Sequence, residues 1–395
     1  MTAIIVYRNQ LLPISETFVY NQTFRLKRYS AFLLGAKWHL GPSIKLPLNR
    51  CQVINQGGVA GISREIQWKL YGRIPSDINE WMIGHRPVLI HAHFGSDGAV
   101  ALPLAQALRI PFLISYHGTD ATMKFSYAWY KSSIPHRLYT MRRGKLAQFA
   151  SRLIVQSNYL AKIISEQHNM PSEKIYCIRH GIDVERFSLN RASLNRAAVE
   201  HGHILYVGRL IERKGLGYLI KALSCIQDEY PQLKLTVIGD GEMRSDYEKM
   251  AFGMLKIPFE FIGAQPHEIV REYFEKAYLF CMPSITMPSG EAETLGMVFL
   301  EAMAMKVPPV SFRSGGIPEV ILHGKTGFLA EEKNVGELAF YIKQLLDNPD
   351  LRHTMGESGR KHVELEFNLD KQNAKLEALY DEVIAEHSKK YGDLI

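Results

Sequence analysis

Residues 204–238, ILYVGRLIERKGLGYLIKALSCIQDEYPQLKLTVI, contain the repeating unit of the fold. A short apolar run, Ile204–Val207, is followed by a glycine-bordered loop, by a longer amphipathic stretch and by a second β-branched run, Lys234–Ile238. Short apolar runs bounded by loops predict buried strands, and apolar residues spaced three and four apart predict a helix between them. The stretch therefore predicts two parallel strands joined by a crossover helix.

The same alternation continues in both directions and predicts two doubly wound α/β units. In the first half, strands are expected at residues 3–7, 88–91, 111–115, 152–155 and 174–178, and helices at 16–27, 96–108 and 158–168. In the second half, strands are expected at 204–207, 234–238, 259–262, 279–282, 307–310 and 326–329. Helices are expected there at 215–229, 241–255, 267–277, 298–305 and 337–346, with a long tail helix at 368–390.

The boundary between the two units is expected at residues 180–199. Gly181 and the polar run 189–195 interrupt both the apolar spacing of helices and the apolar runs of strands there. A chain of 395 residues is long enough for two cores. We expect a first Rossmann-like domain at 1–185, a second at 186–370 and a C-terminal helix at 371–395 that returns to the first. Ligands of such folds usually bind in a cleft at the carboxyl ends of the strands.

The net charge of +7 is concentrated in one segment, since there is no acidic residue between Asp120 and Glu166. The basic residues of segment 124–162 are Lys124, Lys131, Arg137, Arg142, Arg143, Lys145, Arg152 and Lys162. Aromatic residues are interleaved with them, and this composition suits an anionic lipid surface. A solvated helix face is the alternative, and no nucleic-acid partner is expected.

Cysteine spacing and hydropathy favour the cytoplasm. The four cysteines, at positions 51, 177, 225 and 281, lack the short spacing of zinc sites and disulfide scaffolds. The first apolar run has no basic flank like that of a signal peptide, and the longest one, 99–116, is interrupted by charged, polar and proline residues. We expect a cytoplasmic protein that is peripheral at the inner face of the plasma membrane if residues 124–162 bind lipid.

The densest chemical signal is ETLGMVFLEAMA, residues 293–304. A helix is expected to begin near Gly296, and its first backbone N–H groups together with the helix dipole form an anion site. Glu293 lies just before this helix start and Glu301 about one turn inside it. The two carboxylates can hold hydroxyl groups on either side of the bound anion. The alternative is that both acids merely complement the helix N-terminus.

A second signal is the loop Gly208–Gly215, which places Arg209 and Lys214 between a strand and a helix. Arginine offers a planar fork that suits phosphate and lysine offers a point charge, so the two together suit a diphosphate. The alternative is a solvated basic loop, which is the commoner fate of surface charges.

In these two segments the chain resembles glycosyltransferase family 4. The segments that also resemble this family are GDGE at 239–242, GGIPE at 315–319, GKTGF at 324–328, SYHGTD at 115–120 and IRHGID at 178–183. The resemblance implies the GT-B fold, two facing Rossmann-like domains with an interdomain cleft. It also implies a nucleotide-sugar donor, no metal ion, no cofactor, and retention at the anomeric carbon. A UDP-sugar is expected from the frequency of uridine in the family alone.

The resemblance implies a role for each matching residue. Arg209 and Lys214 would neutralise the donor diphosphate, Glu293 would hold hydroxyls of the transferred sugar, and Glu301 would hold the ribose. His117, from the first domain, would face the sugar and contact it during transfer. The remaining donor contacts implied are backbone groups of Gln265, toward the base, and of Leu295, Gly296, Met297 and Val298, toward sugar and phosphate.

The chemistry of transfer agrees with these roles, because fixed cations stabilise the negative charge that develops on a leaving diphosphate. No nucleophilic carboxylate stands out in the sequence, so we hypothesise a front-side mechanism in which the leaving phosphate accepts the incoming proton. The family expectation is thus a metal-independent retaining hexosyltransferase. Its acceptor would be a saccharide or a lipid-linked saccharide in bacterial exopolysaccharide, O-antigen or similar glycan assembly.

One segment departs from the commoner family pattern. Many members have a glycine-rich loop after the first strand, whereas this chain has LPISETF at residues 12–18. This variant resembles the bacterial polysaccharide transferases of the family. Ser15 as the N-cap of a helix is the alternative interpretation of the same residues.

Other interpretations explain less of the sequence. A sugar-nucleotide epimerase of the same fold and a basic membrane- or nucleic-acid-binding scaffold are the alternative functions. Residues 239–244 mimic a dinucleotide-binding fingerprint, but Arg244 replaces its third glycine. His91 and His93 share a strand face, yet no third ligand stands at a spacing that suggests zinc, so packing at the strand end is favoured.

Overall fold

The computed structural model describes residues 1–11, 17–38, 47–122, 134–188 and 199–392, which form two compact units. Unit 1 comprises Met1–Gly181 and Leu369–Ile395, and unit 2 comprises Ile182–Asn368. The expected boundaries, 185/186 and 370/371, lie a few residues further on. Ile182 and Val184 belong to the core of unit 2, and the backbone N–H of Ile182 donates to the carbonyl of Phe367 (2.7 Å). The polar run 189–195 lies outside the described residues.

Unit 1 is built on a seven-stranded parallel sheet in the order β3-β2-β1-β4-β5-β6-β7. Its strands are β1 (Thr2–Leu11), β2 (Tyr29–Trp38), β3 (Cys51–Val53), β4 (Ile90–His93), β5 (Phe112–Ser115), β6 (Arg152–Val155) and β7 (Ile175–Cys177). One face of the sheet packs against α2 (Gly58–Tyr71), α3 (Ser76–His85), α4 (Gly95–Leu108), α7 (Ile134–Phe149) and α8 (Asn158–Glu166). The short helix α5 (Thr119–Thr122) follows β5.

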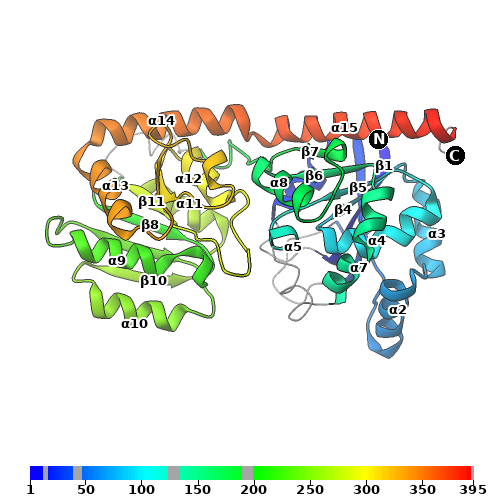
Figure 1. The fold of residues 1–395 in the computed structure, drawn as a ribbon, viewed down its shortest axis with the longest axis horizontal. Helices are drawn as coiled ribbons and strands as arrows, with labels where there is room; N and C mark the ends of the chain where they lie inside the picture. The colour runs from blue at the N-terminus through cyan, green and yellow to red at the C-terminus, as the bar shows by residue number, and fades with distance from the viewer. Residues whose placement is uncertain (12–16, 39–46, 123–133, 189–198, 393–395) are drawn as a thin grey trace. The chain divides into compact units, whose positions relative to one another are not determined.

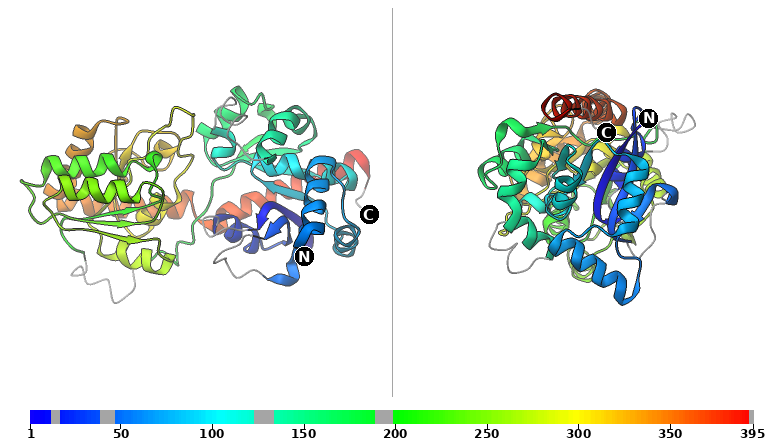
Figure 2. Two further views of the ribbon diagram at one scale, coloured as in Figure 1. Left: turned by 90° about the horizontal axis from the view of Figure 1, so that it is seen from below. Right: turned by 90° about the vertical axis from the view of Figure 1, so that its right-hand side faces the viewer.

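The other face of this sheet is covered by α1 (Thr17–Phe24) and by the C-terminal helix α15 (Leu369–Tyr391). Figures 1 and 2 show α15, in red, running along unit 1. The hydroxyl of Tyr29 donates to Asp381 (2.7 Å), and the guanidinium of Arg152 pairs with Glu382 and Glu386 (2.6 and 2.8 Å). These contacts join residues that are more than 200 positions apart, and they place the tail helix in unit 1.

Unit 2 contains a six-stranded parallel sheet in the order β10-β9-β8-β11-β12-β13. Its strands are β8 (His203–Val207), β9 (Lys234–Ile238), β10 (Phe259–Gly263), β11 (Leu279–Cys281), β12 (Pro309–Phe312) and β13 (Phe328–Ala330). Its helices are α9 (Leu216–Ile226), α10 (Arg244–Met254), α11 (His267–Lys276), α12 (Met297–Ala304), α13 (Val335–Asp347) and α14 (Pro349–Glu366).

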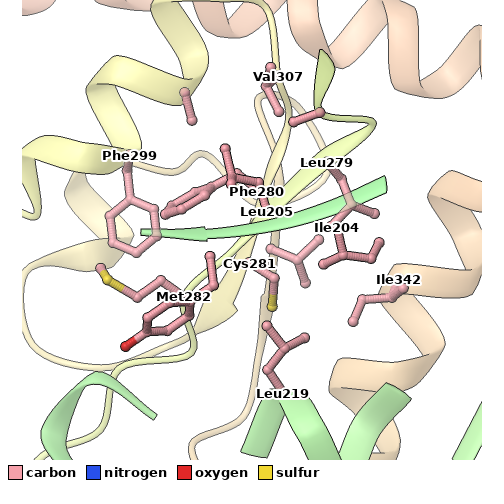
Figure 3. Close-up of a cluster of buried hydrophobic side chains, with 14 of the residues drawn as sticks. Ile204, Leu205, Leu219, Leu279, Phe280, Cys281, Met282, Phe299, Val307 and Ile342 are labelled. Atoms are coloured by element: carbon pink, nitrogen blue, oxygen red, sulfur yellow. The ribbon is translucent and has the colours of Figure 1, made fainter. Parts of the chain in front are cut away.

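The core of unit 2 lies directly behind the loops that follow β8 and β11. Figure 3 shows side chains of β8, β11 and α12 meeting there, with Phe280 beside Phe299 at a ring-centroid distance of 5.6 Å. Met282 and Phe299 are fully buried, so the loop between them starts and ends on rigid supports. This arrangement holds the backbone of residues 283–296 in place.

All of the expected strands and helices are present, with ends that differ by a few residues, but β2, β3, α2, α3, α5, α7 and α14 were not expected. Helix α14 escapes detection because two of its four buried residues are Gly356 and Gly359, which carry no apolar signal. Helix α2 was missed because apolar residues lie on its exposed side as well as on its buried side, so the sequence does not alternate between a polar and an apolar face. The expected helix start at Ser15 lies outside the described residues. No helix in the described ranges combines the length and apolar content that crossing a bilayer requires.

Candidate active site

The loop after β8 packs tightly against the loop after β11. Gly215 has a φ of +72°, and a Cβ there would lie 1.8 Å from the carbonyl oxygen of Pro283. Only glycine fits this position, because any side chain would be strained and would collide with the backbone. The contact brings Lys214 to the start of the segment that leads to Glu293. A backbone hydrogen bond from Ile285 to the carbonyl of Arg213 (2.9 Å) reinforces it.

Glu293 lies at the centre of the cationic group that results. Its Oε2 accepts a hydrogen bond from Nζ of Lys214 and lies 3.4 Å from a guanidinium nitrogen of Arg213. Its backbone carbonyl accepts a hydrogen bond from the N–H of Gly316 (2.7 Å), and a Cβ at Gly315 would lie 2.1 Å from the same oxygen. Glu293 is therefore held by its side chain and by its backbone.

The charges in this cluster act on one another at short range. Burial raises the pKa of Glu293, but the positive charges of Lys214, Arg213 and Arg209 outweigh it and hold the pKa below its usual range. The pKa of Lys214 is lowered because burial and the neighbouring Arg213 outweigh the attraction of Glu293. One carboxylate faces three cations, so the cluster has an excess of positive charge and suits an anion.

The N-terminus of α12 lies beside this cluster. Gly296 is the N-cap with a φ of +81°, and a Cβ on it would lie 2.5 Å from the ring of Phe299 and 3.3 Å from Cγ of Glu293. The first turn, from Met297, has no acidic residue, and its leading N–H groups have no partner within the helix. Leu295 is buried, whereas Met297 and Val298 are half-buried. The helix end therefore adds backbone donors to the same anion site.

Glu301 has a different environment from Glu293. It is buried in α12, and Nδ1 of His267, at the start of α11, lies 3.6 Å from its Oε1. Burial raises the pKa of Glu301 to about 8 despite the positive charge of Arg186, and burial lowers the pKa of His267. Both side chains are therefore mostly uncharged at neutral pH.

Gln265 lies between β10 and α11 with its side chain turned onto its own loop, where Nε2 donates to the carbonyl of Ile262 (2.7 Å). The neighbouring Gly263 accepts a hydrogen bond through its carbonyl from the N–H of Gly239 (2.9 Å), which ties the loop after β10 to the loop after β9. A fixed side chain leaves the backbone of Gln265 as the part suited to recognition.

His117 lies in unit 1, just after β5, in a row of imidazoles. Its Nε2 is 3.0 Å from Nδ1 of His93, and its Nδ1 is 3.0 Å from Nε2 of His180. The three rings are stacked with interplanar angles of 9° and 15°, and Phe18 packs against His117 and His180. The carboxylate of Asp120 accepts backbone hydrogen bonds from His117 and Gly118 (3.2 and 2.9 Å), which fixes the loop.

Burial lowers the pKa of His93, His117 and His180, so all three imidazoles are neutral. A neutral imidazole donates with one nitrogen and accepts with the other. The two hydrogen bonds therefore run in the same direction along the row, and the tautomer of His117 is coupled to those of its neighbours. Both ring nitrogens of His117 are already engaged.

His91 lies two positions before His93 on the same strand, β4. Its Nδ1 lies 2.6 Å from the hydroxyl of Tyr380 and its Nε2 lies 2.7 Å from Oγ of Ser115. Both ring nitrogens are therefore hydrogen-bonded within unit 1. Throughout the part of the chain that the structure describes, no group of three or more His, Cys, Asp or Glu side chains is placed to hold a metal ion.

Comparisons with known proteins show which family the chain resembles. The model for glycosyl transferases group 1 matches residues 195–362, and the model for glycosyltransferase family 4 matches residues 47–186. The chain belongs to the group 1 glycosyltransferases of family 4. Together the two matches span the cationic cluster, both carboxylates and the imidazole row.

Two curated relatives and one solved structure illustrate the likeness. The amylovoran biosynthesis glycosyltransferase AmsK of Erwinia amylovora is 32% identical over 70% of this chain and 65% of its own length. The putative colanic acid biosynthesis glycosyltransferase WcaL of Escherichia coli is 28% identical over 73% of this chain and 69% of its own. HepE of Anabaena in complex with UDP superposes with a TM-score of 0.76 at 18% identity, covering 97% of this chain and all of that one. The expected fold class, GT-B, is confirmed.

Sequence reasoning did not identify three sets of contacts around the candidate residues. Arg213 contacts Glu293 beside Lys214. The only sequence feature that could have indicated this contact is that Arg213 directly precedes Lys214 in the run Glu-Arg-Lys. His267 lies beside Glu301 although the two are 34 positions apart. His93 and His180 flank His117 from β4 and from the segment after β7. The sequence signal that could have found these histidines is that each lies at, or a few residues after, the carboxyl end of a strand in the same parallel sheet.

The pKa of Glu301 gives a testable pH dependence. Because the pKa rises from 4.5 to about 8 on folding, the buried carboxyl group destabilises the glycosyltransferase progressively as the pH increases through that range. We expect Glu301→Gln to match wild type below pH 4.5 and to be more stable by about 1–3 kcal/mol above pH 8. Thermal melts across pH measure this difference. Glu331→Gln, at an exposed surface pair, is the control, and an equal pH trend in both variants would contradict the prediction.

Proposed function

We propose that the chain is a metal-independent, retaining hexosyltransferase that moves a sugar from a UDP-sugar to a saccharide or lipid-linked saccharide acceptor. The carrying observation is the group of Arg209, Arg213 and Lys214 around Glu293, beside the N-terminus of α12. A nucleoside diphosphate fits this group, because its charges meet cations and backbone donors at once. The complexes of HepE with UDP and with UDP-glucose support the choice of donor.

The same geometry supports the proposed chemistry. Breaking the glycosyl–diphosphate bond places negative charge on the leaving oxygen, and preorganised cations stabilise it in the transition state. Glu293 is ion-paired to Lys214 and fixed through its carbonyl, which suits binding of sugar hydroxyls better than attack on the anomeric carbon. In the front-side mechanism, the acceptor hydroxyl attacks from the side that the leaving phosphate occupies, and that phosphate takes its proton.

The other residues take the roles that the family resemblance implies. Glu301 hydrogen-bonds the ribose hydroxyls, because its protonated carboxyl group donates through its O–H and accepts through its carbonyl oxygen. The backbone of Gln265 contacts the base, and the amides of Leu295–Val298 complete the sugar and phosphate cradle. His117 contacts the transferred sugar through its backbone or through its ring. Contact through the ring requires one ring nitrogen to exchange its hydrogen bond with His93 or His180 for one with the sugar.

The imidazole row makes His180 a positioning residue for His117. We expect His180→Ala to lower the transfer rate by about 10–100-fold, because His117 loses the partner that orients its ring and selects its tautomer. Affinity for UDP, measured by calorimetry, should stay the same. His180→Gln carries an amide that can replace Nε2 and should restore part of the rate. Equal loss in both variants, or a matching loss of UDP affinity, would show that His180 only supports the fold.

The names of the relatives support the choice of acceptor, and the charge pattern supports the subcellular location. AmsK and WcaL are named for amylovoran and colanic acid biosynthesis, which favours an acceptor in bacterial cell-surface polysaccharide assembly. We place the enzyme in the cytoplasm, peripheral at the inner face of the plasma membrane. Within segment 124–162, Arg137, Lys145 and Lys162 are exposed, whereas Arg152 is ion-paired to α15. Lys124 and Lys131 lie outside the described residues.

A thermal-shift screen of nucleotides and nucleotide sugars tests the donor assignment. A ligand at 100 times its Kd stabilises a protein by about 2.7 kcal/mol. UDP and one or a few UDP-sugars should raise the melting temperature of wild type, and the effect should shrink in Lys214→Ala. Stabilisation by another nucleotide would replace uridine in the proposal. If no nucleotide or nucleotide sugar stabilises the protein, the proposed function is wrong.

A further inference from the structure

Helix α2 of unit 1 exposes a continuous apolar stripe to solvent. Val59, Ile62, Ile66 and Leu70 are 85%, 55%, 47% and 43% exposed. Their spacing of three, four and four residues places them on one side of the helix. Isolated exposed apolar residues are common, but a stripe along a whole helix marks an interaction surface.

The opposite side of α2 explains why the stripe faces outward. Gly61 and Trp68 are buried there, and the indole N–H of Trp68 donates to the hydroxyl of Tyr7 in β1 (3.0 Å). Lys69 is bonded to Glu65 one turn earlier, and a Cβ on Gly61 would lie 2.4 Å from Oδ1 of Asn55. The helix is thus fixed on one side, and Figure 1 shows α2 projecting from the rest of unit 1.

Helix α7 exposes a second face with the same spacing and a different composition. Ile134, Arg137, Met141 and Lys145 lie on that face at intervals of three and four residues, and all four are exposed. Helix α7 has no acidic residue, and it carries four basic ones in all. Its outer face therefore combines apolar side chains with positive charge.

Arg142 joins the two helices. Its guanidinium donates to the carbonyl of Leu70 at the end of α2 (3.0 Å) and to the carbonyl of Ala99 in α4 (2.8 Å). The apolar stripe of α2 therefore ends beside the cationic helix α7. An apolar helix face next to basic residues is the pattern of proteins that bind in the interface of an anionic membrane.

We propose that the outer faces of α2 and α7 dock on an anionic lipid bilayer, with Val59, Ile62, Ile66 and Leu70 inserted among the lipids. Arg137 and Lys145 meet the lipid phosphates. Charge decides between this occupant and a second copy of the chain, because two copies would bring two acid-free cationic helices together. Docking involves residues of unit 1 alone. It deepens the membrane location given in the proposed function, and it does not depend on the transfer reaction or on the donor.

Vesicle co-sedimentation without nucleotide or acceptor tests this proposal. Wild type should bind phosphatidylglycerol-containing vesicles at low salt, and bind pure phosphatidylcholine vesicles much more weakly. The double variant Ile62→Ser, Ile66→Ser keeps the net charge and should bind anionic vesicles at least tenfold more weakly. Arg137→Gln with Lys145→Gln should remove the preference for anionic lipid. Phe252→Ser, at an even more exposed apolar residue of α10 in unit 2, is the control and should bind like wild type.

Circular dichroism melts establish that every variant is folded, and sedimentation velocity reports the oligomeric state. Vesicle binding by the Ile62→Ser, Ile66→Ser protein equal to wild type would overturn the role of α2. Absence of vesicle binding by wild type would overturn the proposal. In that case, a wild-type dimer that the serine substitutions dissociate would identify the stripe as an interface between copies. Because no donor is present, these outcomes are separate from those of the thermal-shift screen.

Discussion

Lys214→Ala and Arg209→Ala are each expected to lower the rate of sugar transfer by about 10²–10³-fold, the usual loss when one preorganised donor to a developing negative charge is removed. The loss should fall on kcat, because the charge on the leaving diphosphate grows in the transition state. Lys214 bonds to Glu293, and Arg209 adds its positive charge to the same cluster. Initial-rate kinetics with the donor found in the thermal-shift screen measure both parameters.

Folding must be controlled in this experiment, because removing one partner of a mostly buried ion pair destabilises a protein. Lys214→Gln retains a hydrogen-bond donor for Glu293 without the charge, and it should keep the fold while losing the rate. Lys256→Ala breaks an ion pair with Asp228 on the surface of unit 2 and should leave the kinetics unchanged. Near-wild-type rates in the Arg209 and Lys214 variants would eliminate the proposed diphosphate clamp.

Glu293→Gln should separate sugar recognition from diphosphate binding. The amide keeps the size of the carboxylate but loses the charge-assisted hydrogen bonds to sugar hydroxyls, and we expect transfer to fall by at least about 100-fold. Affinity for UDP should be retained or increased, because Lys214 and Arg213 no longer share their charge with a carboxylate. Transfer assays and calorimetry with UDP measure the two effects.

The result for Glu293→Gln also decides between the two interpretations of the acid. If Glu293 only complements the helix N-terminus and its cationic neighbours, the variant should transfer sugar at nearly the wild-type rate. Glu291→Gln, two positions earlier on the same loop, is a suitable control because Glu291 bonds locally to Ser289 (3.0 Å). A loss of UDP affinity together with transfer would show that the substitution disturbs the whole loop.

Much of the fold could be predicted because both sheets are parallel and buried on both faces. Such strands appear as short apolar runs, and the bounds of β6 and β9 agree with the expected ones. Helices α7 and α14 were missed because each buries few side chains, so their apolar periodicity is weak. Strand β2 was missed although it lies between β1 and β3 in the sheet.

The candidate site was predictable to the extent that its residues lie in strand-to-helix loops. The carboxyl ends of parallel strands meet at one edge of a sheet, so Lys214 and Glu293 could be expected to lie close together. That Lys214 bonds Glu293 directly, and that Arg213 joins them, depends on the contact between Gly215 and Pro283. No pattern within either segment encodes that contact.

By itself, the sequence determined the fold class, the two-unit organisation and the loops that carry the chemistry, because apolar periodicity and glycine positions are local properties. The tertiary structure decided which charges are neutralised and which remain exposed. Arg152, one of the eight cations of segment 124–162, is paired to Glu382 and Glu386 of the tail helix, whereas Arg137 and Lys145 face solvent. Pairing and burial depend on distances between residues that are remote in the sequence, and only the folded chain sets those distances.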